Sequence, residues 1–394
     1  MFAPRSSARS HRWVLLVCAG LPGLLCGWLL AGDAGGPRRA PPGAARVGDV
    51  GPTRAAARPA PVAMRACAPA LTAGGGPVSA GADPALTELP ALPARPPALA
   101  ELLAAARAVS PERLAGEVGP GLFLELAWLL RTDPAAVDEA RGAVAGAPPA
   151  VAALILDALG DAGTPAARAA LLGLAREPLP AELLPNLYLS LGQQEPTRAV
   201  VAALEEACAA QDARRARWGL HGLGSMAARA EPACAEALVA RLERELDRAG
   251  AHDVARAEAA LEALGNAGHA RAIPSLLGGL AHGDPRARQA AAYALRKHTR
   301  LPGVETALAL AGRDPSPLVR AAAVEVLAGG RLEPLLDALA DQDPGVRLQA
   351  VEALGSRLRG GLPLAERARQ ALERAALADE ADGVRALARH HLGS

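Results

Sequence analysis

The sequence contains few aromatic residues and no stretch in which apolar and polar residues alternate as they do along a β-strand. Phenylalanine, tyrosine and tryptophan together make up 2% of the 394 residues. The lack of strand-like alternation excludes a large β-sheet cavity. Trp128 and Trp218 are the only tryptophans after residue 32, and each lies inside an apolar run. We therefore predict that both pack in a core.

Positive charge does not exceed negative charge in the larger, C-terminal part of the chain. The chain has a formal net charge of +1. Residues 1–32 and residues 33–98 each contribute +3, so residues 99–394 carry −5. Domains that bind nucleic acid are normally basic, with cations clustered on one face, so we predict no nucleic-acid partner. Lys297 is the only lysine; the use of arginine, alanine, glycine and proline suggests a bacterial host with a GC-rich genome.

The five cysteines do not form a disulfide framework. Cys18, Cys26 and Cys67 lie in the first hundred residues, which leaves Cys208 and Cys234 in the C-terminal region. These two are six residues out of register within a local 32-residue period, which is about 9 Å along a helix. A disulfide needs Cα atoms within about 7 Å of each other. We predict that both thiols are buried and reduced.

Charge is absent from one long N-terminal run, residues 13–32. Its length reaches the roughly 20 residues that span a bilayer and exceeds the about 7–15 residues of a signal-peptide core. We predict a single-pass anchor in the cell membrane, with the remainder of the chain on the periplasmic or extracellular side. The alternative is a signal peptide cleaved near Ala34, which would release a secreted or periplasmic protein. Residues 33–98, rich in Pro, Ala, Gly and Arg, are predicted to be a disordered linker.

What the sequence does contain is a repeat. A helical apolar stripe ends in Leu-Gly, or in Leu followed by Arg or Ala, at intervals of 27 to 41 residues. The second residue of each copy stands at positions 160, 192, 224, 265, 296, 328, 355 and 393. Self-similarity at such a period is typical of a stacked-repeat architecture. We expect the glycine to end the helix, because a helix C-terminus favours a residue that tolerates positive φ.

Each repeat reads as two helices joined by a tight turn. Ala257, Leu261 and Leu264 recur at i, i+4 and i+7, and a second stripe of the same period begins at Ile273. Three repeats begin with Asp-Pro, at residues 284, 314 and 343. Aspartate caps a helix N-terminus, and proline suits the first helical position.

An arginine follows each Asp-Pro within two turns. These residues are Arg288, Arg320 and Arg347, with Arg385 as a weaker copy. Because acid and base recur together, we interpret them as a structural ladder. In that ladder Arg347 would pair with Asp343 or with an acid of the adjacent repeat. A stripe of free arginines available to a partner is the alternative.

The pattern DPxVRxxAxxAL followed by LGxxGxxxAIPxLL resembles the HEAT-repeat family, in particular its short bacterial repeats of the phycobilisome-lyase type, within the armadillo-like α-solenoids. The resemblance is specific over residues 252–358 and weaker over 148–251. It implies an all-α fold, a right-handed superhelix of about seven helix pairs and a last lone helix over residues 148–394. Residues 99–147 are expected to form a helical cap region.

No catalytic constellation is found in the sequence. A hydroxylase family with HEAT repeats binds iron through His-Glu pairs, and no histidine here is followed by glutamate. His298, His390 and His391 are expected at helix termini, where a cation suits the helix dipole. We therefore predict no catalytic, cofactor-binding or metal-binding residue and no small-molecule substrate.

The repeats favour a non-catalytic scaffold that binds a protein partner, since a row of equivalent helices offers many weak contacts to an extended chain. Two alternatives remain open. One is an accessory factor of lyase type that acts on a bound protein. The other is a helical carrier that binds lipid or the cell envelope. A row of polar residues would favour the scaffold, a convergent acid/base cluster the accessory factor, and a wide apolar groove the carrier.

Overall fold

The computed structural model describes residues 98–116, 118–360 and 365–393. All of them belong to one compact unit, residues 91–394. The predicted anchor at 13–32 lies outside the described residues, as does the predicted linker apart from residue 98. Among the helices of the described part, none is long and apolar enough to cross a bilayer.

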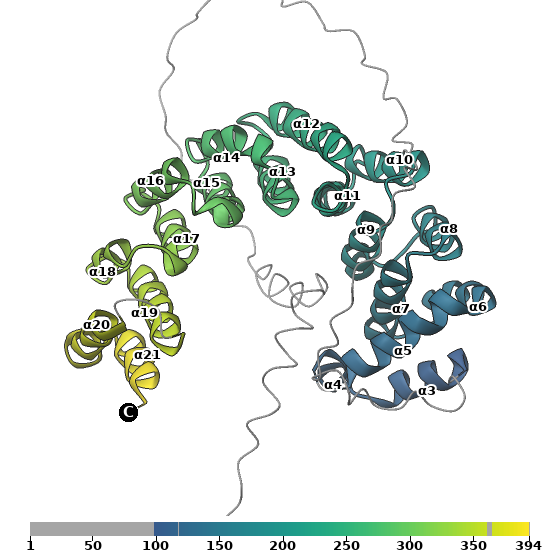
Figure 1. Ribbon diagram of the computed structural model, residues 1–394, viewed down its shortest axis with the longest axis horizontal. Helices are drawn as coiled ribbons and strands as arrows, with labels where there is room; N and C mark the ends of the chain where they lie inside the picture. The colour runs from purple at the N-terminus through teal and green to yellow at the C-terminus, as the bar shows by residue number, and fades with distance from the viewer. Residues whose placement is uncertain (1–97, 117, 361–364, 394) are drawn as a thin grey trace, which may run out of the picture. The chain divides into compact units, whose positions relative to one another are not determined.

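The unit is built from α-helices in two rows (Figure 1), and no strand occurs in the described residues. The inner row consists of α5 (Gly119–Thr132), α7 (Pro149–Ala162), α9 (Leu184–Gly192), α11 (Ala213–Ala227), α13 (Val254–Ala267), α15 (Pro285–Ala294), α17 (Pro317–Val326), α19 (Pro344–Arg359) and α21 (Asp382–Leu392). The outer row consists of α6 (Pro134–Val144), α8 (Pro165–Leu174), α10 (Arg198–Cys208), α12 (Pro232–Ala249), α14 (Ile273–Gly279), α16 (Pro302–Ala311), α18 (Glu333–Ala338) and α20 (Ala365–Ala378). Two helices precede the rows, α3 (Leu99–Ala108) and α4 (Pro111–Ala115).

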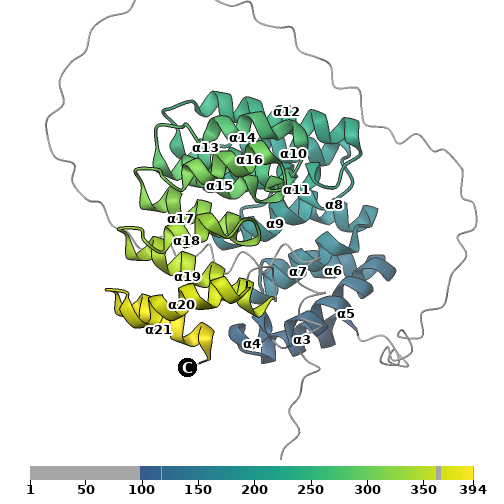
Figure 2. The same ribbon diagram turned by 60° about the vertical axis from the view of Figure 1, so that its left-hand side comes forward.

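Each inner helix packs against the inner helix before it and the one after it, as in a solenoid. Figure 2 shows the successive pairs stacked side by side. From residue 148 onward the chain forms seven pairs, α7/α8 to α19/α20, followed by the lone helix α21. The predicted all-α solenoid is confirmed. The two rows also continue towards the N-terminus into α5 and α6, which pack on α7 and α8.

The helix starts follow the predicted capping with one exception. Asp284 caps α15 by accepting a hydrogen bond from the Arg286 N–H, and Asp343 caps α19 in the same way. The prediction for Asp314 is wrong, because α17 begins two residues later, with Ser316 as its N-cap. Asp314 is thereby left to bind an arginine of the preceding repeat.

The Leu-Gly pairs do not end the helices as predicted. Gly160 and Gly265 lie inside α7 and α13, whose ends are formed by Gly163 and Gly268 at φ 64° and 61°. A Cβ built on Gly265 would lie 2.5 Å from the Cα of Ala294 in the next inner helix. The repeated glycine therefore allows neighbouring inner helices to approach closely. The prediction holds for Gly393, which ends α21 at φ 78°.

The core runs between the two rows and consists mainly of leucine and alanine. Five of the leucines before the repeated glycine are fully buried: Leu159, Leu191, Leu223, Leu264 and Leu354. The last one, Leu392, is partly buried. Alanine at the helix contacts allows close packing without loss of helix propensity. The repeated leucine is therefore the residue that fills the space between the rows.

Two predictions about single residue types have different outcomes. Trp128 is 41% exposed on α5, so its predicted core position is wrong, and Trp218 on α11 is half-buried. The reason for Trp128 is that the buried face of α5 is already filled by residues such as Leu126 and Leu130. Cys208 and Cys234 are buried and form no disulfide, as predicted.

Candidate interaction surface

The arginines that follow the Asp-Pro turns form a ladder of ion pairs between repeats. Each guanidinium is bound by two hydrogen bonds to an aspartate of the following repeat, with shortest distances of 2.7–2.8 Å. The pairs are Arg288–Asp314, Arg320–Asp341 and Arg347–Asp379. The predicted structural ladder is confirmed, and the partner of Arg347 is an acid of the adjacent repeat rather than Asp343.

Each ladder arginine also ties its own repeat together. The Arg347 Nη1 donates to the carbonyl of Asp341 at 2.9 Å, and Arg320 donates to the carbonyl of Asp314 at the same distance. The hydrogen bond from Arg347 lowers the pKa of Asp379, and the bond from Arg320 lowers that of Asp341. Because these arginines are almost buried and fully paired, they do not form a basic surface for a partner. Arg385, in the last helix, pairs with Asp382 of its own helix.

A second set of polar side chains lies along the inner row, and each contact joins one inner helix to the next. Asn186 donates to Asp157 at 3.0 Å, and Arg217 donates to Glu262 at 3.0 Å. Further along, Glu325 accepts hydrogen bonds from the hydroxyl of Tyr293 at 2.8 Å and from Gln349 at 2.9 Å. We call this set the inner polar belt. Its members are Asp157, Asn186, Arg217, His221, Glu262, Asn266, Tyr293, Arg296, Glu325, Gln349, Glu352 and His391.

The middle of the belt is an acid/base cluster on α11 and α13. The Nε2 of His221 lies 3.1 Å from Glu262. This is an electrostatic contact rather than an aligned hydrogen bond, because Nε2 has no partner in hydrogen-bond geometry. Burial acts to raise the pKa of Glu262, but His221 and Arg217 outweigh it and the pKa is lowered. Glu258, one turn earlier, has its pKa raised by burial and then by the charge of Glu262.

Asp157 occupies the N-terminal part of the belt, on α7. Burial raises its pKa to about 6, although two hydrogen bonds from the Asn186 amide act in the opposite direction. An amide can stabilise a carboxylate only partly, because it carries no charge. Asp157 is thus the carboxyl group of the belt that titrates near neutral pH.

The belt ends at the contact between α19 and α21. His391 donates to Glu352 at 2.9 Å, and its ring lies directly over Gly355, where any side chain would overlap it. His390 and His391 lie in the last turn of α21, and His298 lies at the end of a 3-10 turn, Leu295–His298, so all three occupy the predicted termini. Within the described ranges, no three His, Cys, Asp or Glu side chains are grouped so as to hold a metal ion.

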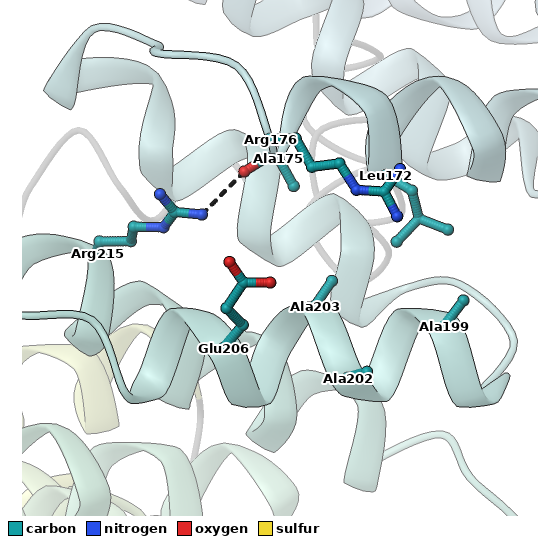
Figure 3. A pocket seen from close by; sticks show the side chains of 8 residues that line it. All are labelled: Leu172, Ala175, Arg176, Ala199, Ala202, Ala203, Glu206 and Arg215. Atoms are coloured by element: carbon teal, nitrogen blue, oxygen red, sulfur yellow. Dashed lines mark hydrogen bonds between the residues drawn. The ribbon is translucent and has the colours of Figure 1, made fainter.

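A small hollow opens on the outer row between α8 and α10 (Figure 3). Its volume is about 150 Å³ and its floor is formed by alanines of α10, while Arg176, Glu206 and Arg215 stand around it. Arg215 donates to the carbonyl of Ala175 at 2.9 Å, which holds α8 to α11. The hollow shares no residue with the inner polar belt, and its size is that of a single side chain.

The sequence contains a polar stripe that belongs to the belt, but helical periodicity alone does not identify its role. Glu258, Glu262 and Asn266 are spaced at i, i+4 and i+8, on the face of the helix opposite to Leu261 and Leu264. Such a polar stripe reads first as a solvent-exposed face. Only the packing of α13 between α11 and α15 shows that these side chains bond across repeats.

Comparison with known proteins agrees with this architecture. The HEAT repeats family matches residues 235–328 and 304–393. Among solved structures, the chain is similar to the complex of CpcE and CpcF of phycocyanin lyase from Nostoc sp. PCC7120. The identity is 20%, the match covers 74% of this chain and 99% of that one, and the TM-score is 0.36. No sequence among the curated proteins matches the chain.

Two further solved structures match a similar share of the chain. Human deoxyhypusine hydroxylase is 20% identical, with 71% of this chain and 98% of that chain covered and a TM-score of 0.31. The Escherichia coli protein YibA is 17% identical, with 71% and 97% covered and a TM-score of 0.43. The family match shows that residues 235–393 are similar to HEAT repeats, and helix pairs of the same kind precede this part of the chain from α5 onward.

Proposed function

We propose that this protein is a non-catalytic scaffold of HEAT-like repeats that binds an extended segment of a partner protein along its inner helices. The observation that carries the proposal is the inner polar belt, whose members recur on successive inner helices. A partner lying across the row would meet one or two polar side chains on each inner helix from α7 to α21. Many weak contacts of this kind suit a repeat protein, in which each unit contributes separately.

The hydrogen bonds of the inner polar belt suit reversible binding of a partner. Its charged groups are hydrogen-bonded to other members of the belt, so a partner would exchange hydrogen bonds with them instead of neutralising an isolated charge. Glu325 is exposed and Gln349 is partly exposed, and both have further hydrogen-bonding capacity. Polar contacts that form and break at little net cost favour reversible association.

One feature favours a second candidate, an accessory factor that acts on a bound protein. Glu258 is a half-buried carboxyl group with a raised pKa, one turn before Glu262 on α13, and such groups cluster at catalytic sites. None of the residues that line the hollow in Figure 3 belongs to this cluster. Replacement of Glu258 by glutamine would abolish an acid/base activity but leave partner binding within about twofold.

We also propose that residues 13–32 attach the protein to the cell membrane, with the solenoid on the periplasmic or extracellular side. The support is the length and lack of charge of this run in the sequence. Export followed by cleavage is the alternative. In either case the partner would be a protein of the cell envelope in a bacterial host.

Site-specific photo-crosslinking in the host tests the scaffold proposal. A photoreactive residue is placed at Gln289 or Gln349 on the inner row, and at Gln370 on the outer helix α20 as the matched control. We expect one discrete crosslinked protein from both inner positions and none from Gln370. Equal crosslinking from all three positions, or from Gln370 only, would rule out binding along the inner row.

A further inference from the structure

The net negative charge of the solenoid is concentrated at its N-terminal end. Residues 99–164 contain nine acidic residues and four arginines, a formal charge of −5. This equals the charge of the whole region 99–394, so the remaining repeats are neutral in sum. The electric field of this negative charge attracts cationic segments and repels the phosphates of nucleic acids and anionic lipids.

The same end exposes two large apolar side chains on one face of α5. Leu124 is 60% exposed and Trp128 is 41% exposed. They are one helical turn apart and therefore adjacent on the helix surface. Glu125 is exposed between them. We call Leu124, Glu125 and Trp128 the α5 patch.

The two cations that follow the patch in sequence are already engaged. Arg131, one turn further along α5, binds Asp161 at 2.9 Å, and Arg141 binds Glu177 at 2.6 Å. By contrast, Glu125 has no hydrogen bond or ion pair among the described residues. The patch thus combines an unpaired carboxylate with an exposed indole and an exposed leucine.

We propose that the α5 patch binds a cationic, leucine-bearing segment of a partner polypeptide. The proposal rests on the scaffold function and specifies the chemistry of one part of the partner. Glu125 would pair with an arginine or lysine, and the face of Trp128 would hold the same cation by a cation–π contact. Leu124 would pack against an aliphatic side chain. Aromatic residues flanked by charge are typical centres of binding energy in protein interfaces.

The test uses the full chain in nanodiscs of neutral lipid and a fluorescent peptide of twelve residues in which arginine and leucine alternate. We expect saturable binding, seen as a rise in anisotropy. Glu125→Arg and Trp128→Ala should each weaken binding about tenfold or more. Glu139→Arg is the matched control, because it makes the same charge change on α6, where Glu139 is exposed. It should change binding by less than about twofold.

Several outcomes would overturn the proposal. One is no binding by a folded wild-type chain, and another is equal weakening by Glu125→Arg and Glu139→Arg, which would indicate a general field and not a site. A third is binding of vesicles that contain phosphatidylglycerol in place of the peptide, since that would make the patch a membrane surface. Helicity and melting temperature establish that each variant is folded, and Trp128→Phe, which keeps a ring, should retain most of the binding.

The two proposals can fail separately. The crosslinks expected from Gln289 and Gln349 do not involve α5 and report on the scaffold function alone. If they form while the arginine–leucine peptide fails to bind, the scaffold proposal stands and the partner chemistry assigned to the α5 patch is wrong. If neither occurs, both proposals are wrong.

Discussion

Single arginines hold the repeats of this protein in register. The Arg347 side chain binds Asp379 of the next repeat through two hydrogen bonds and the carbonyl of Asp341 through a third. The two charged groups are about nine-tenths buried. Removal of one partner from such a pair leaves a buried charge without compensation, which costs more than loss of an exposed pair. The ladder therefore acts on stability, and its residues are not available to a partner.

Replacement of Arg347 by alanine tests this role. We expect the free energy of unfolding to fall by about 2–4 kcal/mol, because Asp379 is left buried and unpaired. Affinity for a partner should be unchanged at temperatures where the variant is folded. Thermal melting and a binding titration measure the two effects. Arg374→Ala, an exposed arginine on α20, is the control and should cost less than about 0.5 kcal/mol. Unchanged melting with weaker partner binding would restore the alternative of a basic stripe.

Asp157 provides a prediction about pH. Its pKa is raised to about 6, above the value of roughly 3.9 in an unfolded chain. The folded state therefore binds more protons between about pH 4 and 6, and the contribution of Asp157 to stability falls as the pH rises through this range. Asp157→Asn removes the titrating group. The variant should be more stable than the wild type at pH 7, by roughly 1–3 kcal/mol.

The difference in stability between wild type and variant is expected to be smallest at pH 4, where Asp157 is protonated in the folded chain and about half protonated in the unfolded chain. Urea unfolding of wild type and variant at pH 4, 5, 6 and 7 measures this. The comparison with the variant is needed because the ladder aspartates have lowered pKa values, so their own contribution to the stability of the fold is lost as the pH falls. A constant difference at all four pH values would contradict the assignment.

At the scale of the helices, the spacing within the inner row is set by glycine. Gly265 of α13 faces the backbone of Ala294 at the end of α15, and Gly224 of α11 faces the carbonyl of Ala263 in the same way. The leucine before each of these glycines is buried between the rows. One Leu-Gly pair thus serves two interfaces, since leucine fills the core and glycine permits the next inner helix to approach.

Gly265→Ala is expected to destabilise the fold. The added methyl group would overlap the backbone of Ala294, which cannot move like a flexible side chain. We expect a loss of about 1–3 kcal/mol, typical of overpacking. Gly278→Ala on α14 is the matched control, because its Cβ would point into open space. That change should stabilise by about 0.4–1 kcal/mol, since alanine has the better helix propensity. Equal effects in chemical denaturation would show that close approach is not the reason for the glycine.

At the scale of the whole molecule, the pairs of helices in the two rows pack mainly on the pairs next to them. Stability in such an array is nearly a sum of repeat terms and nearest-neighbour terms. A substitution that destabilises one repeat should therefore destabilise the neighbouring repeats more than distant ones. The ladder and the inner polar belt both follow this geometry, because every pair in them joins adjacent repeats.

Leu264→Ala tests the linear array. Leu264 is fully buried, and its truncation should cost about 2–5 kcal/mol through lost transfer energy and the cavity left behind. Hydrogen exchange measured by mass spectrometry should show faster exchange first in α11, α13 and α15. Helices α7 and α21 should change least. Uniform loss of protection across residues 148–393 would contradict a stack of semi-independent repeats.

The N-terminal run gives a prediction about the attachment of the molecule. If residues 13–32 are an uncleaved anchor, the protein remains in the membrane pellet after an alkaline wash, because a spanning helix is not held by charge. Sequencing of the mature N-terminus is the second measurement. A soluble chain that begins near residue 35 would establish cleavage of a signal peptide in place of an anchor.

The sequence by itself determined the repeat, the two-helix unit and the class of fold. Leucine spacing, Asp-Pro starts and recurrent arginines are local features, and each acts within one or two helical turns. The structural character of the ladder could also be predicted, because acid and base recur together. The sequence did not determine which acid pairs with which arginine, since Asp314 and Asp379 reach their partners only across repeats.

The tertiary structure decided the features that depend on contacts between distant residues. The repeated glycine reads as a helix end in sequence, and only the packing of α13 on α15 shows that it is a point of close approach. Trp128 lies in an apolar run, yet α5 buries the opposite side of the helix and leaves the ring exposed. The inner polar belt looks like a solvated stripe on each helix taken alone. Periodicity reports which residues share a helix face, whereas the neighbour that covers that face is fixed only when the repeats stack.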